Sequence, residues 1–206
     1  GTTAAHATSR LLSLALPVAN LSLVEIMGHD KVVVPCASCF RRLKDGNYEI
    51  SHDPGVRAEV DKVLDRPYEG TVKVIHPLEI FSEKEMLKKI EESVTVSMPS
   101  VRVVCYYGCL LTRPPKVMQF DQHEYPMTMD KVLRAAGMET LDWDYKTMCC
   151  GAAFSLTETD IVLKLTGDIL EEAKTVGANA IAVACPLCHA NLDTRQAEIE
   201  QKTGKE

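Results

Sequence analysis

Five cysteines in the second half of the chain have the number and spacing expected of ligands for a multi-metal centre. They follow the pattern C-x39-CC-x34-C-x2-C and are Cys109, Cys149, Cys150, Cys185 and Cys188. A structural zinc ion takes four ligands in a tetrahedron, so five thiolates are more than one zinc ion can use. Cysteine thiolates are the usual ligands of iron–sulfur clusters. The pattern therefore predicts an iron–sulfur cluster.

Other interpretations of these cysteines stay open. Free cysteines are often buried core residues, and Cys105, which lies on a predicted strand, is expected to be one. A zinc-stabilised interaction module is a further alternative, which metal analysis would reveal as zinc without iron. Adjacent cysteines such as Cys149 and Cys150 are poor disulfide partners, and CC and C-x2-C clusters favour a reducing, cytoplasmic compartment.

The composition excludes several classes of protein. The chain has 206 residues, 46% of them hydrophobic, which is enough to bury a sizeable core. Its net charge of -6 and its lack of basic runs argue against nucleic acid or an anionic membrane surface as a partner. No stretch reaches the roughly 18 apolar residues of a membrane span, since the most apolar one, 11–26, contains Pro17 and Glu25.

An internal repeat relates the two halves of the chain. Residues 21–43 (LSLVEIMGHDKVVVPCASCFRRL) align without gaps to residues 170–192 (LEEAKTVGANAIAVACPLCHANL) at a constant offset of 149. The offset pairs three positions of one half with three of the other: Gly28 with Gly177, Cys36 with Cys185, and Cys39 with Cys188. An isolated C-x2-C pair could be a zinc half-site or a thioredoxin-like pair. The repeat instead predicts that Cys36 and Cys39 belong to a second cluster site.

The first copy of the motif is expected to be incomplete. Carried back by the same offset, the CC-Gly triplet falls on the first residues of the chain, and one inserted residue aligns Gly151 with Gly1. We therefore expect an N-terminally truncated fragment, in which the first site keeps only Cys36 and Cys39.

Hydrophobic periodicity predicts an α/β fold. The expected helices are 4–27, 56–64, 77–92, 126–136 and 155–176, with a last helix after Cys188. The expected strands are 31–35, 72–75, 102–106, 139–143 and 180–184, and a polar span lies at 44–55. The architecture is thus two pseudo-repeated cysteine-rich units, 1–98 and 99–206, each with a small parallel-type sheet flanked by helices. The strand at 31–35 leads directly to Cys36, at the strand end where α/β sheets bind ligands.

The cysteine motif resembles that of a known family. A CC-Gly motif with an upstream cysteine and a downstream C-x2-C, repeated twice, resembles the CCG cysteine-rich domain of the heterodisulfide reductase B subunits. Related iron–sulfur subunits serve fumarate, glycolate, lactate and glycerol-3-phosphate oxidoreductases. The runs YGC at 107–109, RP at 113–114 and CPLCH at 185–189 are most similar to the heterodisulfide reductase B subunits. The resemblance covers nearly the whole chain.

The resemblance implies noncubane four-iron four-sulfur clusters, each held by five cysteines, with a disulfide reduced between two of them. One complete site would consist of Cys109, Cys149, Cys150, Cys185 and Cys188, and one partial site of Cys36 and Cys39. The implied function is the catalytic subunit of a heterodisulfide-reductase-like complex, which reduces a small disulfide to two thiols. Its partners would be an electron-donating iron–sulfur subunit and a flavin-containing subunit. The alternative is a non-catalytic electron-transfer subunit of an oxidoreductase.

Two residues near the motif are candidates for contact with a substrate or a cluster. The guanidinium of Arg113 suits an anionic substrate group, and a solvated loop arginine is the alternative. His189 follows Cys188 and can donate a hydrogen bond to a cluster sulfur or a substrate, with helix capping or a surface role as the alternative. His76, which precedes Pro77, is interpreted as a structural turn residue rather than a ligand.

Overall fold

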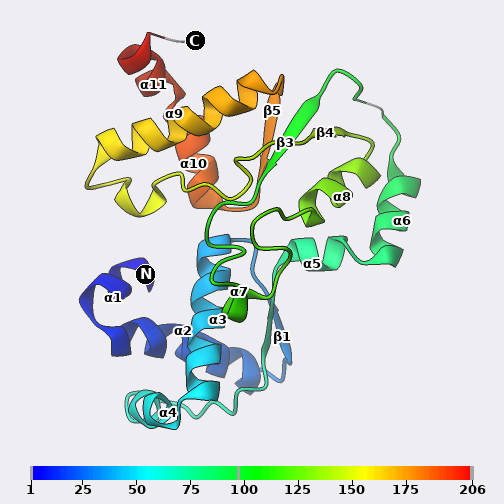
Figure 1. Cartoon of the computed structure of the whole chain (residues 1–206). Helices are drawn as coiled ribbons and strands as arrows, with labels where there is room; N and C mark the ends of the chain where they lie inside the picture. The colour runs from blue at the N-terminus through cyan, green and yellow to red at the C-terminus, as the bar shows by residue number, and fades with distance from the viewer. Residues whose placement is uncertain (1, 97, 205–206) are drawn as a thin grey trace.

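The computed structural model describes residues 2–96 and 98–204, so the predicted equivalence of Gly1 with Gly151 lies outside the described residues. Within these residues the chain forms two small parallel sheets, one in each half, with helices packed around them (Figure 1). The α/β fold expected from the sequence is confirmed. The boundary between two units at 98 and 99 stays a prediction, and buried side chains of both halves share one hydrophobic core.

The second half is built on a three-stranded parallel sheet with the strand order β4-β3-β5. The central strand β3 (Arg102–Tyr106) pairs with β4 (Glu139–Leu141) and β5 (Ala180–Val183), so that Val104 lies between Leu141 and Ile181. Residues 103–106 of β3 are buried on both faces, as is usual for a parallel sheet. The helices described in this half are α7 (Pro115–Met118), α8 (Thr128–Ala135), η1 (Ala152–Phe154), α9 (Thr159–Thr175), α10 (Pro186–Thr194) and α11 (Gln196–Thr203).

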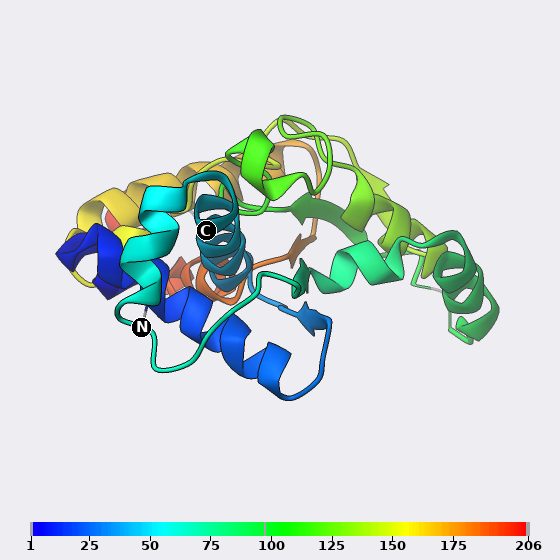
Figure 2. The same cartoon turned by 90° about the horizontal axis from the view of Figure 1, so that it is seen from below.

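The first half pairs two short strands in parallel, β1 (Lys31–Val33) and β2 (Lys73–Ile75). Its helices α1 (Thr2–Thr8), α2 (Arg10–Ile26), α3 (Ala37–His52) and α4 (Pro54–Asp61) pack in succession, with α3 against α2. The halves are joined through α5 (Pro77–Phe81) and α6 (Lys84–Ser93), which pack on α8, and through α7 (Pro115–Met118), which packs on α3. Helices α1 and α6 lie at opposite ends of the molecule (Figure 2).

The internal repeat is visible in the positions at which the elements begin and end. Helix α2 spans 10–26 and α9 spans 159–175, so both of their bounds differ by 149. Strands β1 and β5 begin at 31 and 180, and helices α3 and α10 begin at 37 and 186, which are again 149 apart. Each half therefore contains the same helix–strand–helix unit, with a C-x2-C pair where the strand gives way to the second helix.

The largest differences from the expected helices occur at three places. The helix expected at 4–27 is divided into α1 and α2, because Ser9 has an extended backbone and its hydroxyl accepts a hydrogen bond from the Leu12 amide. The helix expected at 77–92 is likewise divided into α5 and α6, where the backbone of Glu83 is extended. Helix α10 begins before Cys188 rather than after it, because Pro186 is well suited to the first helical position.

The polar span at 44–55 is mostly helical, which corrects the prediction for this segment. Helix α3 continues to His52. Its polar side chains between 41 and 49 are half-buried, and Gly46 faces α2. A Cβ atom at Gly46 would lie 3.2 Å from the Cβ of Pro17 and 3.3 Å from the Cγ2 of Val18. Glycine is a poor helix former, but here it permits the close approach of two helices.

Candidate metal centre

Each C-x2-C pair lies at the N-terminus of a helix that follows a parallel strand. Cys36 is the N-cap residue of α3 and Cys185 is the N-cap residue of α10, both with extended backbones. Cys39 and Cys188 follow within the first turns. The free amide groups and the positive end of the helix dipole at this position stabilise thiolates. The expected placement of cysteines beyond the carboxyl ends of the strands is confirmed.

The five cysteines of the second half form a set of sulfur contacts. The sulfur atoms of Cys150 and Cys188 are 3.3 Å apart. Cys188 also donates a hydrogen bond to the sulfur of Cys185, and Cys109 donates one to the sulfur of Cys149. Loops that lie far apart in the sequence thus bring their thiols into two groups: Cys109 with Cys149, and Cys150 with Cys188 and Cys185.

One cysteine of the first half joins this set. The thiol of Cys36 donates a hydrogen bond to the sulfur of Cys185, which also accepts the backbone N–H of Ser38 at the start of α3. Cys39 is exposed, and its backbone N–H donates to the sulfur of Cys36. The two C-x2-C pairs therefore meet head to head, which the sequence did not predict.

The hydrogen bonds between thiols shift the pKa values of the cysteines in opposite directions. Bonds from Cys188 and from the first-half cysteine lower the pKa of Cys185 to about 2, against the opposing effect of burial. The bond from Cys109 lowers the pKa of Cys149 to about 6, and the hydrogen-bonded contact with Cys188 lowers the pKa of Cys150. The same bonds, together with burial, raise the pKa of Cys109 and Cys188. Thiolates are the form in which cysteine binds metals.

Two glycines with positive φ bring the backbone close to the sulfurs. Gly108 has φ 70°, and a Cβ at this position would lie 3.1 Å from the sulfur of Cys188. Gly151 has φ 73°, and its amide donates to the sulfur of Cys149 at 3.4 Å. Only glycine adopts this backbone region without strain. The glycines of the motif therefore shape the loops that present the thiols.

A fully buried ion pair lies between the loop that carries Cys109 and the loop that carries Cys149 and Cys150. The Nζ of Lys146 lies 2.7 Å from Oδ1 of Asp130, and both side chains are 0% exposed. The hydroxyl of Tyr107 donates to Oδ2 of Asp130 at 2.7 Å. The carbonyl of Lys146 accepts the amides of Tyr107 at 2.8 Å and Gly108 at 3.2 Å. This network ties the loop that carries Cys109 to the loop that carries the cysteine pair.

The imidazole of His76 is the most deeply buried histidine near the sulfurs. Its residue is 3% exposed, and its ring makes edge contacts with Phe40 and Phe120 at centroid distances of 5.6 and 5.7 Å. The Ala184 carbonyl and the Cys185 sulfur of the second half lie beside it, and burial lowers the pKa of His76 to about 4. The interpretation as a turn residue holds in part, because His76 is the N-cap of α5.

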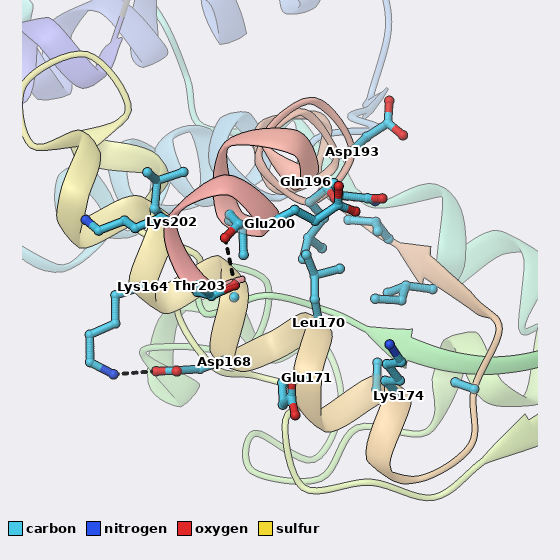
Figure 3. Close-up of a pocket in the computed structure, with 18 of the residues that line it drawn as sticks. Lys164, Asp168, Leu170, Glu171, Lys174, Asp193, Gln196, Glu200, Lys202 and Thr203 are labelled. Atoms are coloured by element: carbon cyan, nitrogen blue, oxygen red, sulfur yellow. Dashed lines mark hydrogen bonds and ion pairs between the residues drawn. The ribbon is translucent and has the colours of Figure 1, made fainter. Parts of the chain in front are cut away.

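The two other candidate residues have different surroundings. Arg113 is ion-paired with Glu124 at 2.5 Å and donates to the hydroxyl of Thr147 at 3.1 Å, so its guanidinium braces the loop before the cysteine pair. His189 is exposed and lines a groove of about 1000 Å³. The groove lies between α9, β5 and α11 (Figure 3). Contact of either residue with a substrate or a cluster stays a prediction.

The donor set fits an iron–sulfur cluster by its chemistry. Within 2–96 and 98–204, no three histidine, cysteine or acidic side chains surround one point as the ligands of a single ion do. A cluster binds its cysteines on separate irons, so its thiolates occupy separate positions. Five thiols, three of them with a lowered pKa, and loops opened by glycine are suited to such ligation.

Comparison with known proteins adds independent information. Residues 103–193 match the family described as CCG: Cysteine-rich domain. The chain is 31% identical over 196 residues to the B subunit of the ferredoxin/F(420)H(2)-dependent CoB-CoM heterodisulfide reductase of Methanosarcina acetivorans. It is 30% identical over 196 residues to the B subunit of the ferredoxin:CoB-CoM heterodisulfide reductase of Methanosarcina mazei. Each alignment covers 93% of this chain, which spans 65% of the length of either relative.

A more distant relative carries a different name. The chain is 24% identical over 204 residues to the "8-methylmenaquinol:fumarate reductase membrane anchor subunit" of Wolinella succinogenes, with 98% of this chain and 70% of that protein aligned. Among the described residues of the present chain, none of the helices combines the length and the apolar character needed to traverse a bilayer.

A solved structure shares the fold. The crystal structure of a hypothetical protein from Helicobacter pylori superposes with a TM-score of 0.67 at 9% identity, over 96% of this chain and 36% of that one. The resemblance expected from the cysteine motif is confirmed by the family match and by the two Methanosarcina relatives. Residues 103–193 of the chain are therefore similar to the CCG cysteine-rich domain family.

Proposed function

We propose that this chain is the catalytic iron–sulfur subunit of a heterodisulfide-reductase-like complex, which reduces a disulfide to two thiols. The observation that carries the proposal is the assembly of Cys109, Cys149, Cys150, Cys185 and Cys188 from three separate loops into contacting groups. The similarity to two heterodisulfide reductase B subunits supports the same function. The cytoplasmic location expected from the sequence is part of the proposal.

The five cysteines of the second half would hold one noncubane four-iron four-sulfur cluster. Cys36 and Cys39 would contribute to a second cluster, and their position against α10 supports two adjacent cofactors. Such clusters, when bound, supply single electrons and an iron open to a sulfur ligand. The zinc-stabilised module remains the alternative to be excluded by metal analysis.

The reaction consumes two electrons and two protons for each disulfide, because R–S–S–R′ becomes RSH and R′SH. An electron-donating iron–sulfur subunit and a flavin-containing subunit of the same complex would supply the electrons. A substrate can approach where Cys39 and Cys149 are exposed. The Methanosarcina relatives are named for the CoB-CoM heterodisulfide, so we propose a small mixed disulfide of that class, used in methanogenesis, as the substrate.

The second candidate function is a non-catalytic electron-transfer subunit. The similarity to a subunit of a fumarate reductase favours it, since that protein is named as an anchor rather than as the reductase itself. The two functions differ in one respect. A catalytic protein of this kind binds a thiol or disulfide at iron, whereas an electron-transfer protein needs only a short path between redox centres.

The test is iron and acid-labile sulfide analysis of the anaerobically prepared protein, with electron paramagnetic resonance before and after addition of a thiol. We expect iron and sulfide without zinc, and a spectrum that changes with the thiol. Cys150→Ser should remove the signal of the second-half cluster, whereas Cys105→Ala, at a buried cysteine of β3, should retain it. A stoichiometric zinc ion, or full signal in Cys150→Ser, would refute the ligand assignment. A normal signal that ignores thiols would favour electron transfer.

A further inference from the structure

Asn191 is a buried polar side chain of α10 that contacts the cysteine pair of another loop. It lies one helical turn after Cys188, and the residue is 3% exposed. Its Nδ2 atom is 3.0 Å from the carbonyl oxygen of Cys150 and 3.8 Å from the sulfur of the same residue. An amide nitrogen carries two hydrogens, so Asn191 can donate to the carbonyl and to the sulfur at the same time.

The surroundings of the Asn191 side chain fix which end of the amide faces Cys150. A backbone carbonyl can only accept a hydrogen bond, so the group beside it is the NH₂ and not the oxygen. The hydroxyl of Ser155 donates to Oδ1 of Asn191 at 3.0 Å and holds the other end. The guanidinium of Arg195 in turn donates to the Ser155 carbonyl at 2.9 Å. The donor of Asn191 is therefore kept pointing at Cys150.

A second side chain separates the two contacts that Asn191 makes. The hydroxyl of Thr166, which is 0% exposed, donates to the same Cys150 carbonyl at 3.4 Å. The carbonyl thus has two side-chain donors, and Asn191 also reaches the sulfur. The contact with Cys188 is the main cause that lowers the pKa of Cys150, and the Ala152 amide and Asn191 add to it against the effect of burial. Each of these contacts favours negative charge on the sulfur.

We propose that Asn191 is a positioning residue that holds the Cys150 loop and, by donating from Nδ2 to the Cys150 sulfur, raises the reduction potential of the cluster at that sulfur. The inference rests on the proposed function, because it requires a cluster at the second-half cysteines. A hydrogen bond to a ligand sulfur stabilises the reduced state, which carries more negative charge, over the oxidised state. The side chain acts through Cys150 and needs no contact with the substrate.

The test compares Asn191→Leu with Thr166→Val in the anaerobically prepared protein, by redox titration monitored with electron paramagnetic resonance. Leucine is close to asparagine in size but has no donor. In Asn191→Leu, the reduction equilibrium should shift about tenfold toward the oxidised state, equal to about 59 mV for a one-electron couple. Thr166→Val is the matched control, because it removes a donor from the same carbonyl and leaves the Asn191 contact with the sulfur. It should bind iron and leave the midpoint potential unchanged.

Asn191→Ala is the second variant, since alanine cannot overfill the site, and it should shift the potential in the same direction. An unchanged potential in an iron-loaded Asn191 variant, or an equal shift in Thr166→Val, would overturn the proposal. Failure of both Asn191 variants to fold, with Thr166→Val folded, would also overturn it, since Asn191 would then serve folding alone. These outcomes leave the proposed function standing. An unaltered protein that binds no iron would overturn the proposed function and this proposal together.

Discussion

Removal of the buried charge on Lys146 should destabilise the protein more than any surface change. In Lys146→Met, the Asp130 carboxylate would remain in a position that is 0% exposed and would keep the Tyr107 hydroxyl and the Cys105 thiol as partners. Breaking a buried ion pair on one side costs about 3 to 5 kcal/mol. For a chain of this size, that loss lowers Tm by roughly 6 to 20 °C.

The assay is denaturant unfolding of the metal-free protein, followed by iron analysis of the anaerobically prepared variant. Lys164→Met is the matched control, because Lys164 forms a similar pair with Asp168 at 2.8 Å but is 74% exposed. This control should be indistinguishable from the unaltered protein. The double variant Lys146→Met with Asp130→Asn should recover at least half of the loss, because no charge then remains buried. Equal stabilities of Lys146→Met and Lys164→Met would refute the reasoning.

Two further predictions concern backbone strain and pH. Gly108→Ala should cost at least about 1 kcal/mol more than Gly70→Ala and should lower iron content, because both glycines have positive φ but only the Gly108 Cβ would meet a sulfur; equal costs in unfolding experiments would contradict this. Burial raises the pKa of Asp121, but hydrogen bonds from the Thr128 hydroxyl and from three backbone amides outweigh it and lower the pKa below 3.8. The stabilisation by Asp121 should therefore be present above pH 3.8 and disappear as the pH falls through the folded-state pKa, so the stability difference between Asp121→Asn and the unaltered protein should shrink in acid.

The repeat and the cysteine pattern could be predicted because residue types and their spacing along the chain are enough to identify both. The offset of 149 relates α2 to α9 at both ends, and three buried positions near their starts correspond: Ser13 with Val162, Leu14 with Leu163, and Pro17 with Thr166. The strand at Arg102–Tyr106 was predicted to the residue, because its β-branched and aromatic side chains leave no helical alternative. The breaks within helices were harder to predict. Ser9 caps α2 through a hydrogen bond to its hydroxyl, which the hydrophobic pattern does not reveal.

The contacts that define the site were not predictable from one sequence. Lysine and aspartate are usually exposed, and nothing in the residues around Lys146 or Asp130 indicates that both are fully buried. The burial of His76 beside the Ala184 carbonyl and the meeting of Cys36 with Cys185 both depend on how the halves pack, which no local spacing encodes. Helix α3 was not predicted for the same reason. Glycine usually disfavours a helix, and only the packing of α2 against Gly46 explains its presence within α3.

The head-to-head arrangement of α3 and α10 also limits how the chain can vary. An insertion between β1 and Cys36, or between β5 and Cys185, would turn one helix and move its thiol away from the other. Helix surfaces and the connection between the halves are free of this restriction. The sequences of the two repeated units can therefore diverge over most of their length. The junctions from β1 to α3 and from β5 to α10 must each keep a fixed number of residues.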